Sequence, residues 1–472
     1  MTFPAYPAYK DSGVEWLGEV PEHWAVHPLK RAIERIESGT SVNAADFPAE
    51  PGSLGVLKTS CVYTGKFDWA ENKSVDDEDL SRVSCPLRKD TLIVSRMNTP
   101  DLVGATGLVT EAPNGIFLPD RLWQVYFLVN HSPEFLFYFS KSREYREQVK
   151  MACSGTSASM QNLGQDDFRG LLFAEPPKPE QTQIARFLDH ETARIDALIE
   201  EQQRLIELLK EKRQAVISHA VTKGLDPTVP MKDSGVEWLG EVPAHWQVGA
   251  LKHFISPVPG AIKTGPFGSH LKSEDMKEGP YKVFNQRSVI DADFSAGDNF
   301  ISEEKFAELR GFTAFPGDVL VTTRGTIGRA AILPDNAEVG ILHPCLLRVQ
   351  VDESKITSSY LCRLIQESHL LKTQLSLMSN STTIEVIYSE TMANLLIPVP
   401  PITEQAQIAA FLDDVISKFG ALTSDANESV RLLQERRSAL ISAAVTGKID
   451  VRGWQPPAST QAPKLEEVAE AV

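Results

Sequence analysis

The chain has 472 residues, of which 42% are hydrophobic and 8% aromatic, and a formal net charge of −16. This composition supports several folded cores and excludes disorder as the default state. No run of about 18 apolar residues occurs, and Met1–Pro21 lacks the charged start and apolar stretch of a signal peptide. We therefore expect neither membrane insertion nor export, and we place the protein in the cytoplasm.

The acidic balance and the cysteines exclude further classes. Phosphate contacts require clustered Lys and Arg, so the net charge disfavours a solitary nucleic-acid binder. It disfavours a subunit of a larger complex less, because a local basic groove can sit on an acidic chain. The five cysteines are odd in number and never spaced as CxxC, which argues against a zinc site or a disulfide framework.

The chain contains a tandem duplication. Lys10–Trp24 reads KDSGVEWLGEVPEHW and returns at Lys232–Trp246 with Ala244 in place of Glu22. A second repeated element begins at Glu180 and returns at Glu404, and the residues between the two elements have diverged. We expect two domains of the same fold whose surfaces differ.

The first repeat is predicted to be a mixed α/β domain over residues 1–175, with strands at Thr91–Arg96 and Leu122–Val129. Ser154–Ser159 is predicted to be a polar loop near its end. A long helix is expected within residues 176–226, where apolar residues follow a helical period from Ile184 to Ala220.

The second repeat follows the same order. Residues 227–399 are predicted to form a mixed α/β domain with strands at Val319–Thr323 and Leu346–Val351, and residues 400–450 a second long helix. Asp90–Arg96 parallels Asp318–Arg324, so we expect Arg96 and Arg324 to be counterparts. Residues 451–472 are expected to be a mobile tail rich in Pro, Ala and Glu.

Both predicted helices have defined ends. Pro177 and Pro401 mark their beginnings, and Gly224 and Gly447 follow their last turns. Their narrow apolar stripes require a partner helix, and each repeat supplies one for the other. Antiparallel pairing would give a coiled-coil spacer with pseudo-two-fold symmetry. The alternative is two independent helical hairpins that never meet.

With these elements in place, the chain resembles the specificity subunits of type I restriction-modification systems. The resemblance spans nearly the whole sequence and rests on GVEWLGEVPxHW (Gly13–Trp24, Gly235–Trp246) and PPxxEQxxIAxFLD (Pro176–Asp189, Pro400–Asp413). It implies an α+β fold in which two target-recognition domains are held apart by the helical spacer. It also implies that each domain reads one half of a bipartite sequence in double-stranded DNA. Methyltransferase subunits would bind around the helices, and restriction (translocase-nuclease) subunits would attach to them.

The geometry predicted from the residues is compatible with that resemblance. A rigid spacer between two different readers predicts an asymmetric target with a fixed gap. A pseudo-two-fold frame repeats its surface, so we expect two copies of one methyltransferase subunit around one chain.

Candidate DNA-binding residues are chosen as cations, amides and hydroxyls at strand ends and in polar loops of both domains, because these groups read base edges and phosphates. Arg96 is the leading contact in the first domain. For each candidate the competing interpretation is a surface ion pair or a solvated turn. The full set is Lys58, Thr59, Ser60, Arg96, Asn98, Thr99, Arg121, Ser157, Ser159, Gln161, Lys263, Thr264, Ser269, Lys272, Asn285, Gln286, Arg287, Arg324, Thr326, Ser381, Thr382 and Thr383.

The aromatic residues and histidines of the duplicated segments Lys10–Trp24 and Lys232–Trp246 are expected to be structural. The tryptophans Trp16, Trp24, Trp238 and Trp246 suit packing onto the helices better than base stacking. His23 and His245 lack Cys or carboxylate partners at ligand spacing, so we expect packed histidines and no metal site.

Catalytic motifs are missing from the sequence. It contains neither GxxxxGK[ST] nor Asn-Pro-Pro-aromatic, and no acidic-x-Lys follows a suitable carboxylate. We therefore expect a noncatalytic subunit without cofactors of its own, with S-adenosylmethionine, ATP and magnesium on partner subunits. The alternatives are an enzyme that methylates or cuts by itself, and a structural adaptor that joins protein partners through its long helices.

Overall fold

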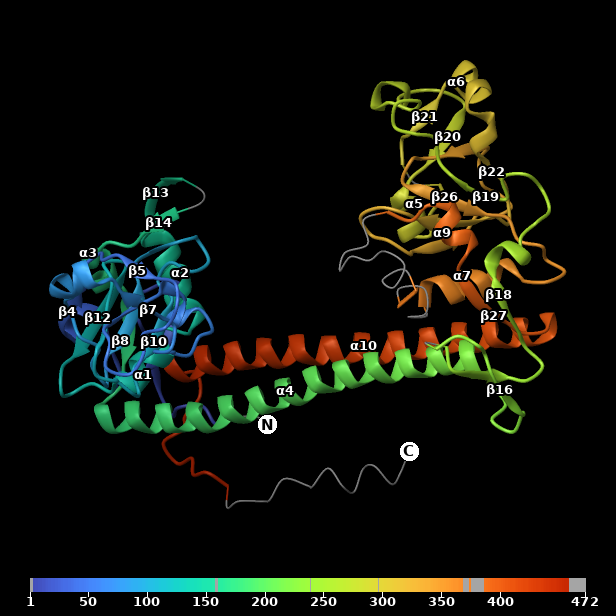
Figure 1. The fold of residues 1–472 in the computed structure, drawn as a ribbon. Coiled ribbons are helices and arrows are strands. Elements are labelled where there is room, and N and C mark those ends of the chain that lie inside the picture. Colours follow the sequence, from blue (N-terminus) through green and yellow to red (C-terminus); the bar gives the residue numbers. More distant parts are fainter. Residues whose placement is uncertain are drawn as a thin grey trace. The chain divides into compact units, whose positions relative to one another are not determined.

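The computed structural model describes residues 3–157, 160–237, 239–295, 297–367, 373–374 and 386–457 (Figure 1). The chain divides into two units, Met1–Gln202 with Glu428–Val472, and Gln203–Asn427. Each unit is a mixed α/β domain that carries parts of two long helices, as predicted. Within the described residues, no helix is long and apolar enough to cross a membrane.

The first unit contains two four-stranded sheets and a small three-stranded one. The main sheet has the order β10-β8-β12-β4, from strands Thr106–Leu108, Leu92–Ser95, Leu122–Phe127 and Ile33–Ser38. The second has the order β11-β6-β7-β5, from Ile116–Phe117, Gly55–Leu57, Asn72–Val75 and Ala44–Ala45. Helices α1 (Pro133–Phe139), α2 (Arg143–Ala152) and α3 (Gln165–Gly170) follow them along the chain.

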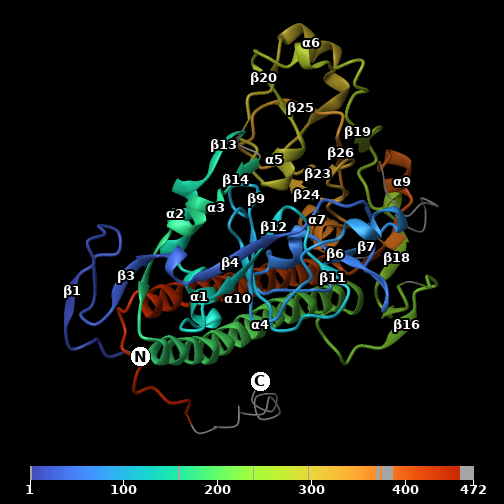
Figure 2. The same cartoon turned by 90° about the vertical axis from the view of Figure 1, so that its left-hand side faces the viewer.

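The second unit repeats this plan. Its main sheet has the order β19-β26-β23-β24, from Ile262–Thr264, Leu346–Val349, Val319–Thr322 and Ala330–Ile332 (Figure 2). The other has the order β21-β20-β25-β22, from Phe300–Ile301, Tyr281–Phe284, Gly340–Leu342 and Thr313–Ala314. Its helices are α5 (Gln286–Ile290), α6 (Glu303–Glu308), α7 (Ser358–Glu367) and α9 (Ser389–Ala393).

Strand pairing makes the two domains equivalent. In each second sheet a central strand pairs in parallel with one neighbour, β6 with β11 and β20 with β25, and antiparallel with another. In each main sheet the strand after this parallel neighbour is central and antiparallel on both sides. The prediction of one fold with divergent surfaces therefore agrees with the topology.

The register corrects one predicted equivalence. Ser95 lies opposite Leu122 at the start of β12, while Thr322 lies opposite Leu346 at the start of β26. The following glycines, Gly104 and Gly328, donate to the carbonyls of Ser95 and Thr322 respectively. Arg96 therefore corresponds to Thr323, and Arg324 lies one residue further along, where the side chain points to the other side of an extended chain. The predicted pairing of Arg96 with Arg324 is wrong because the sequence match was one residue out of register.

The predicted loop at Ser154–Ser159 is also wrong for its described part. Ser154–Ser157 form β13, which pairs antiparallel with β14 (Met160–Asn162). β14 pairs in turn with β9 (Met97–Asn98). The alternation of small polar residues contains no apolar face, so nothing in the pattern distinguished a two-sided polar hairpin from a loop.

Two long helices complete the chain. α4 (Lys178–Lys223) has 46 residues and α10 (Ile402–Val445) has 44. At a rise of about 1.5 Å per residue, each is roughly 65–70 Å long. Proline precedes each helix, and glycine with positive φ follows it, Gly224 at 77° and Gly447 at 73°, which is the conformation that glycine adopts without a steric penalty.

The helices pair antiparallel inside each unit. In the first unit the start of α4 meets the end of α10, where Arg437 Nε donates to Asp196 Oδ1 over 2.8 Å. In the second unit the end of α4 meets the start of α10, and Ile217 shares a core with Ile408 and Leu412. The predicted partner exchange between repeats is therefore confirmed, and the alternative of two separate hairpins does not hold.

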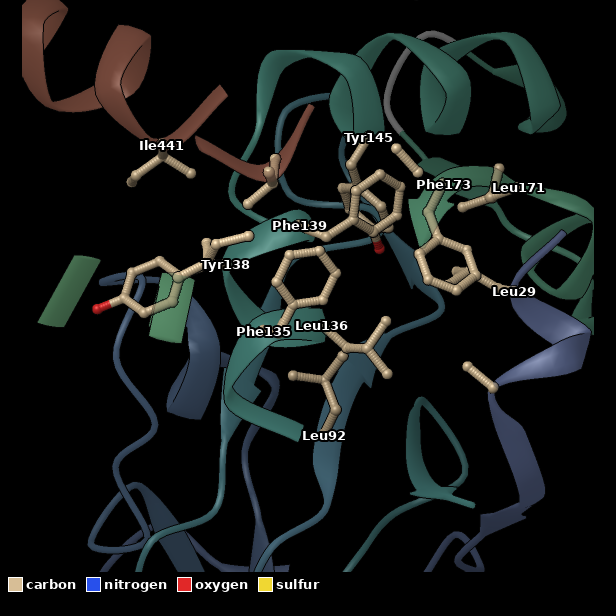
Figure 3. Packing of buried hydrophobic residues seen from close by; sticks show 14 of the residues in the cluster. Leu29, Leu92, Phe135, Leu136, Tyr138, Phe139, Tyr145, Leu171, Phe173 and Ile441 are labelled. Atoms are coloured by element: carbon tan, nitrogen blue, oxygen red, sulfur yellow. The ribbon is translucent and has the colours of Figure 1, made fainter. Parts of the chain in front are cut away.

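Each domain core is closed by the helix end of the other repeat. Ile441, Ala444 and Val445 of α10 are buried in the first unit among Phe139, Phe173 and their neighbours. Figure 3 shows Ile441 on the α10 ribbon facing the aromatic cluster. In the second unit the equivalent residues of α4 are Ile217, Ala220 and Val221, all at most 1% exposed.

In each repeat, one carboxylate joins the duplicated segment to the first turn of a long helix. Glu180 accepts hydrogen bonds from Trp24 Nε1 at 3.1 Å and Tyr6 Oη at 2.5 Å, and it contacts His23 Nε2 at 2.9 Å. Trp24 is fully buried, which agrees with the packing role predicted for it. Burial and the neighbouring Glu180 raise the pKa of Tyr6 far above its usual range.

Glu404 repeats this arrangement in the second unit. It accepts from Trp246 Nε1 at 3.1 Å and contacts His245 Nε2 at 2.8 Å. The prediction of packed histidines is wrong for His23 and His245, whose side chains are 40% and 43% exposed and bond to a carboxylate at the first turn of a long helix. Negative charge is favoured there by the helix dipole. Trp238 lies outside the described residues.

The glutamine that follows each glutamate ties the helix to the domain. Gln181 Oε1 accepts from Ser132 N at 2.9 Å, and Gln405 Oε1 accepts from Thr357 N at 2.8 Å. Their amide groups donate to the carbonyls of Pro176 and Pro400. Both glutamines are at most 1% exposed, so replacing either would leave buried backbone groups without partners.

The first prediction concerns the Glu180 contact. Replacing Glu180 with Ala removes the acceptor of buried Trp24 Nε1 and of Tyr6 Oη, which should lower the stability of the first unit by about 1–3 kcal/mol. Urea denaturation followed by tryptophan fluorescence measures the change. Glu404→Ala is the matched variant, and its effect should be smaller because the Glu404 side chain is 22% exposed against 7% for Glu180. Unchanged unfolding of Glu180→Ala would contradict this role.

A second prediction follows from the exchanged helix ends. A half-chain of residues 1–226 lacks Ile441 and Val445 but carries their equivalents, Ile217 and Val221, at its own helix end. Two copies can close each other's cores by the same exchange, so the half-chain should be a dimer in light scattering. The same fragment with Ile217→Asp should remain monomeric. A monomeric unsubstituted fragment would show that the exchange does not hold the halves together.

Candidate nucleic-acid interface

The predicted residues of the first domain gather where β8, β12 and β4 meet one edge of the main sheet. β8 ends at Ser95 and β12 begins at Leu122, and β4 ends at Ser38 opposite Trp123. Arg96 follows β8, and its Nε donates to Asp120 O at 2.7 Å. Gln161 lies opposite Asn98 on the neighbouring strand. This edge therefore brings Arg96, Asn98 and Gln161 together.

A hydrogen-bonded tyrosine organises this first edge. Tyr63 Oη accepts from Asn98 Nδ2 at 2.6 Å and lies 2.7 Å from Thr59 Oγ1. Asn98 is 9% exposed; its amide also donates to Ser95 Oγ, and its carbonyl accepts from Thr99 N. Both amide hydrogens of Asn98 are thus used inside the protein, whereas Tyr63 is 36% exposed. Asn98 therefore positions Tyr63, whose hydroxyl is held by Asn98 and Thr59 while part of the residue remains exposed.

Two predicted residues of this domain are engaged elsewhere. Lys58 Nζ pairs with Asp46 at 3.3 Å, and Lys73 pairs with the same carboxylate at 3.1 Å. Hydrogen bonds from Lys73 and Lys58 lower the pKa of Asp46. Ser60 Oγ donates to Glu71 Oε2 at 2.5 Å. The ion pair and the hydrogen bond are what the competing interpretation of these residues expects.

The remaining predicted residues of this domain differ in exposure. Thr99 and Arg121 are exposed near the same edge, and Arg96 N donates to Arg121 O. Ser157 lies in β13, while Ser159 lies outside the described residues.

The second domain gathers its candidates at the equivalent edge. β23 ends at Thr322 opposite Leu346, where β26 begins, and β19 ends at Thr264 opposite Leu347. Gln286 Nε2 donates to Arg324 O, which joins the segment after β20 to the segment after β23. Asn285 caps α5 through Oδ1, which accepts from Arg287 N and Ser288 N. Thr264 N donates to Ser389 Oγ at 3.1 Å.

The arginines at this second edge differ in whether they form ion pairs. Arg287 is 87% exposed but pairs with Asp291 at 3.1 Å within one helical turn. The exposed Arg324 forms none of the ion pairs found among the described residues. Burial lowers the pKa of His343, and its Nδ1 accepts from Cys345 N, so this imidazole adds no positive charge. Arg324 is therefore the available cation of the central strand end.

The other predicted residues of this domain flank the edge. Thr326 is exposed in the turn after Arg324, and Ser269 and Lys272 are exposed beyond β19. Lys263 Nζ lies 4.5 Å from the centre of the Phe312 ring. Ser381, Thr382 and Thr383 lie outside the described residues.

Comparison with known proteins identifies what these two edges belong to. Residues 268–431 match the family model of the type I restriction modification DNA specificity domain. The type I restriction enzyme StySPI specificity subunit of Salmonella potsdam is 22% identical over 455 residues, 93% of this chain and 91% of the relative. The putative MjaX specificity subunit of Methanocaldococcus jannaschii is 22% identical over 448 residues, 92% and 96% of the two chains. Over nearly its whole length the chain is therefore similar to type I restriction enzyme specificity subunits.

Solved structures agree with the fold of this specificity subunit. A chain from a study of complex assembly and conformational transition of the type I R-M system superimposes with a TM-score of 0.67 at 18% identity, covering 90% of this chain and 98% of that one. The HsdS subunit from Thermoanaerobacter tengcongensis gives a TM-score of 0.51 at 19% identity, covering 91% and 98%. The predicted resemblance and fold class are confirmed.

Sequence reasoning missed several residues of the specificity subunit's two edges. Tyr63 follows the candidate Thr59 by one helical turn. An aromatic residue at that spacing from a candidate was the sequence signal that could have indicated Tyr63. Tyr388 is 59% exposed next to Ile387, whose N–H donates to Thr323 O at 3.0 Å. In the described part of the chain, no three His, Cys, Asp or Glu side chains lie together as a metal site.

A third prediction concerns the first edge. Tyr63→Phe removes the hydroxyl that Asn98 and Thr59 share but keeps the ring, so the fold should lose about 0.5–1.5 kcal/mol. Base preference at one half-site should relax, while the other half-site is read as before. Methylation mapping with the reconstituted complex measures this. Tyr9→Phe is the control, because Tyr9 lies in the strand Tyr9–Asp11, which pairs with Glu19–Pro21 of the duplicated segment and not with either edge. It should leave both preferences intact.

Proposed function

We propose that this specificity subunit reads an asymmetric bipartite sequence in double-stranded DNA, each domain reading one half-site through the sheet edge described above. The observation that carries the proposal is the pairing of one topology with two different edges. The first edge presents Tyr63, Thr59 and Gln161, and the second presents Arg324, Gln286 and Thr264. Two edges of equal geometry and different chemistry suit two different short sequences.

The long helices supply the second part of the proposal. α4 and α10 are continuous over 46 and 44 residues, so we propose that their length fixes the number of unread base pairs between the half-sites. Because the helices and the frame repeat, equivalent surfaces occur twice. We propose that two methyltransferase subunits dock on them and that restriction subunits join the assembly.

The chemistry then resides on the partners. The subunit itself is noncatalytic, and S-adenosylmethionine, ATP and magnesium are proposed to bind the methyltransferase and restriction subunits. We propose that the complex works in the cytoplasm, where its DNA is found. The family assignment disfavours an adaptor that joins only proteins.

The net charge of −16 is compatible with this role. Few phosphate contacts can come from this chain alone, so much of the salt-dependent affinity would come from partner subunits. The specificity subunit would then contribute mainly base contacts. A complex of that kind discriminates sequences through one chain and binds DNA through several.

Mapping of methylated bases tests the function. The chain is co-expressed with a candidate methyltransferase partner, and methylation is mapped across a random-sequence library. The expected result is a split motif with two different half-sites and a constant gap. An assembled complex that binds methyl donor but yields no motif would overturn DNA recognition by these domains.

The fourth prediction assigns one half-site to one domain. Arg324→Ala should weaken recognition of a single half-site by about tenfold to a hundredfold, the effect of losing about 1–3 kcal/mol at one base pair. The other half-site should keep its preferences, as read from the same library. Lys355→Ala is the control, because Lys355 is exposed, pairs with Asp352 at 3.1 Å and follows the end of β26 that lies away from this edge. Loss of preference at both half-sites would contradict modular reading.

A further inference from the structure

One segment of the second edge lies beyond the groups assigned so far. After Thr264 the chain leaves β19 as Gly265-Pro266-Phe267-Gly268 before Ser269. The main chain of this segment is fixed at both sides, because Gly265 N donates to Leu346 O and His270 N donates to Phe267 O, each at 2.8 Å. Phe267 is thus the first residue of a hydrogen-bonded turn at the edge that carries Arg324.

The first domain has a segment at the equivalent position, with a different residue in place of Phe267. Ser38 lies opposite Trp123 in the register in which Thr264 lies opposite Leu347. A Cβ on the next residue, Gly39 or Gly265, would overlap the carbonyl of Leu118 or His343, respectively. Both glycines therefore permit the same close approach of two chain segments. Two residues beyond these glycines stand Ser41 and Phe267.

Phe267 is exposed to an unusual degree. Its side chain is 76% exposed, the highest value for an aromatic residue in the described part of the chain. Its nearest aromatic neighbour is the exposed His270, with ring centres 6.4 Å apart, and Lys263 and Lys272 flank the turn. Phe267 is absent from the buried cores of the second unit, so packing within the fold does not account for its position.

We propose that Phe267 is a wedge that inserts between two stacked base pairs of the half-site read by the second domain. The inference rests on the proposed function. A phenyl group on a narrow turn presents both faces, so a base can stack on each, whereas a groove contact with a thymine methyl uses one face only. Lys263 and Lys272 on either side of the turn can hold the flanking phosphates while the step opens.

The wedge makes the two half-sites differ in kind. With Ser41 at the equivalent position, the first domain reads groups at base edges and leaves the stack closed. The second domain also reads deformability, because an apolar side chain enters most readily at a flexible pyrimidine–purine step. Sequence preference at the opened step then arises without a hydrogen bond to either base.

The experiment uses the full complex with the methyltransferase partner and duplexes that carry 2-aminopurine at successive positions of both half-sites. This base fluoresces more strongly when it is unstacked. The expected result is an increase at one step of the second domain's half-site that Phe267→Ser abolishes, whereas an increase at a base that the methyltransferase extrudes should persist in that variant. That variant should also bind the target roughly tenfold more weakly, in line with loss of base–aromatic stacking.

Two controls make the result specific. Phe315→Ser removes another exposed phenyl group, which is 50% exposed. Phe315 precedes β23 and so lies at the end of that strand opposite to Arg324. This variant should leave the fluorescence unchanged. Replacing each thymine of the half-site with uracil tests the methyl-contact alternative.

The outcomes separate the wedge from the proposed function. Two results would overturn insertion and leave DNA recognition intact. One is specific binding without a 2-aminopurine increase that depends on Phe267. The other is weaker binding to uracil-substituted DNA that Phe267→Ser abolishes. A complex that binds no preferred sequence at all would overturn the proposed function itself.

Discussion

The specificity subunit depends on an exchange of helix ends between its two repeats. Ile441, Ala444 and Val445 complete the core that begins with Trp24 and Phe173, and Ile217, Ala220 and Val221 complete the other. Removing either set would expose several fully buried side chains, at about 1.5–3 kcal/mol for each large one. Neither domain core is therefore closed by its own repeat, which explains why the chain retains two copies of the frame.

The polar contacts of the frame make that exchange specific. Glu180 and Glu404 each accept from a buried tryptophan at the first turn of a long helix, while Gln181 and Gln405 hold the segments before α1 and α7. A buried polar group tolerates few alternative positions because an unmade hydrogen bond is costly. Apolar packing then fills the space that these contacts define. The residues that make these contacts, His23, Trp24, Glu180 and Gln181, recur in the second repeat as His245, Trp246, Glu404 and Gln405.

The edges carry the opposite constraint. Residues such as Tyr63, Phe267 and Arg324 are exposed, and their side chains contribute little to either core, so they can change without loss of the fold. The backbone beneath them is held by the glycines Gly39 and Gly265 and by sheet register. The backbone at each edge is fixed, whereas the exposed side chains on it can differ, so one topology presents different chemical groups in each domain. Specificity is in this sense separated from stability along the same chain.

The sequence by itself determined the duplication, the two long helices with their proline and glycine ends, the main strands and the family, because these follow from local periodicity and from motifs contiguous in the chain. It also placed candidates such as Thr59, Arg324 and Gln286 at strand ends. Tertiary structure alone decided the register that separates Arg96 from Arg324, the β13–β14 pairing, and the surroundings of Asn98, Tyr63 and Phe267. Each of these depends on which distant strand lies alongside, and a one-residue shift moves a side chain to the other face of a strand. Local pattern carries no information about that choice when the two faces of a strand are alike, buried as in β8 and β23 or polar in sequence as in β13.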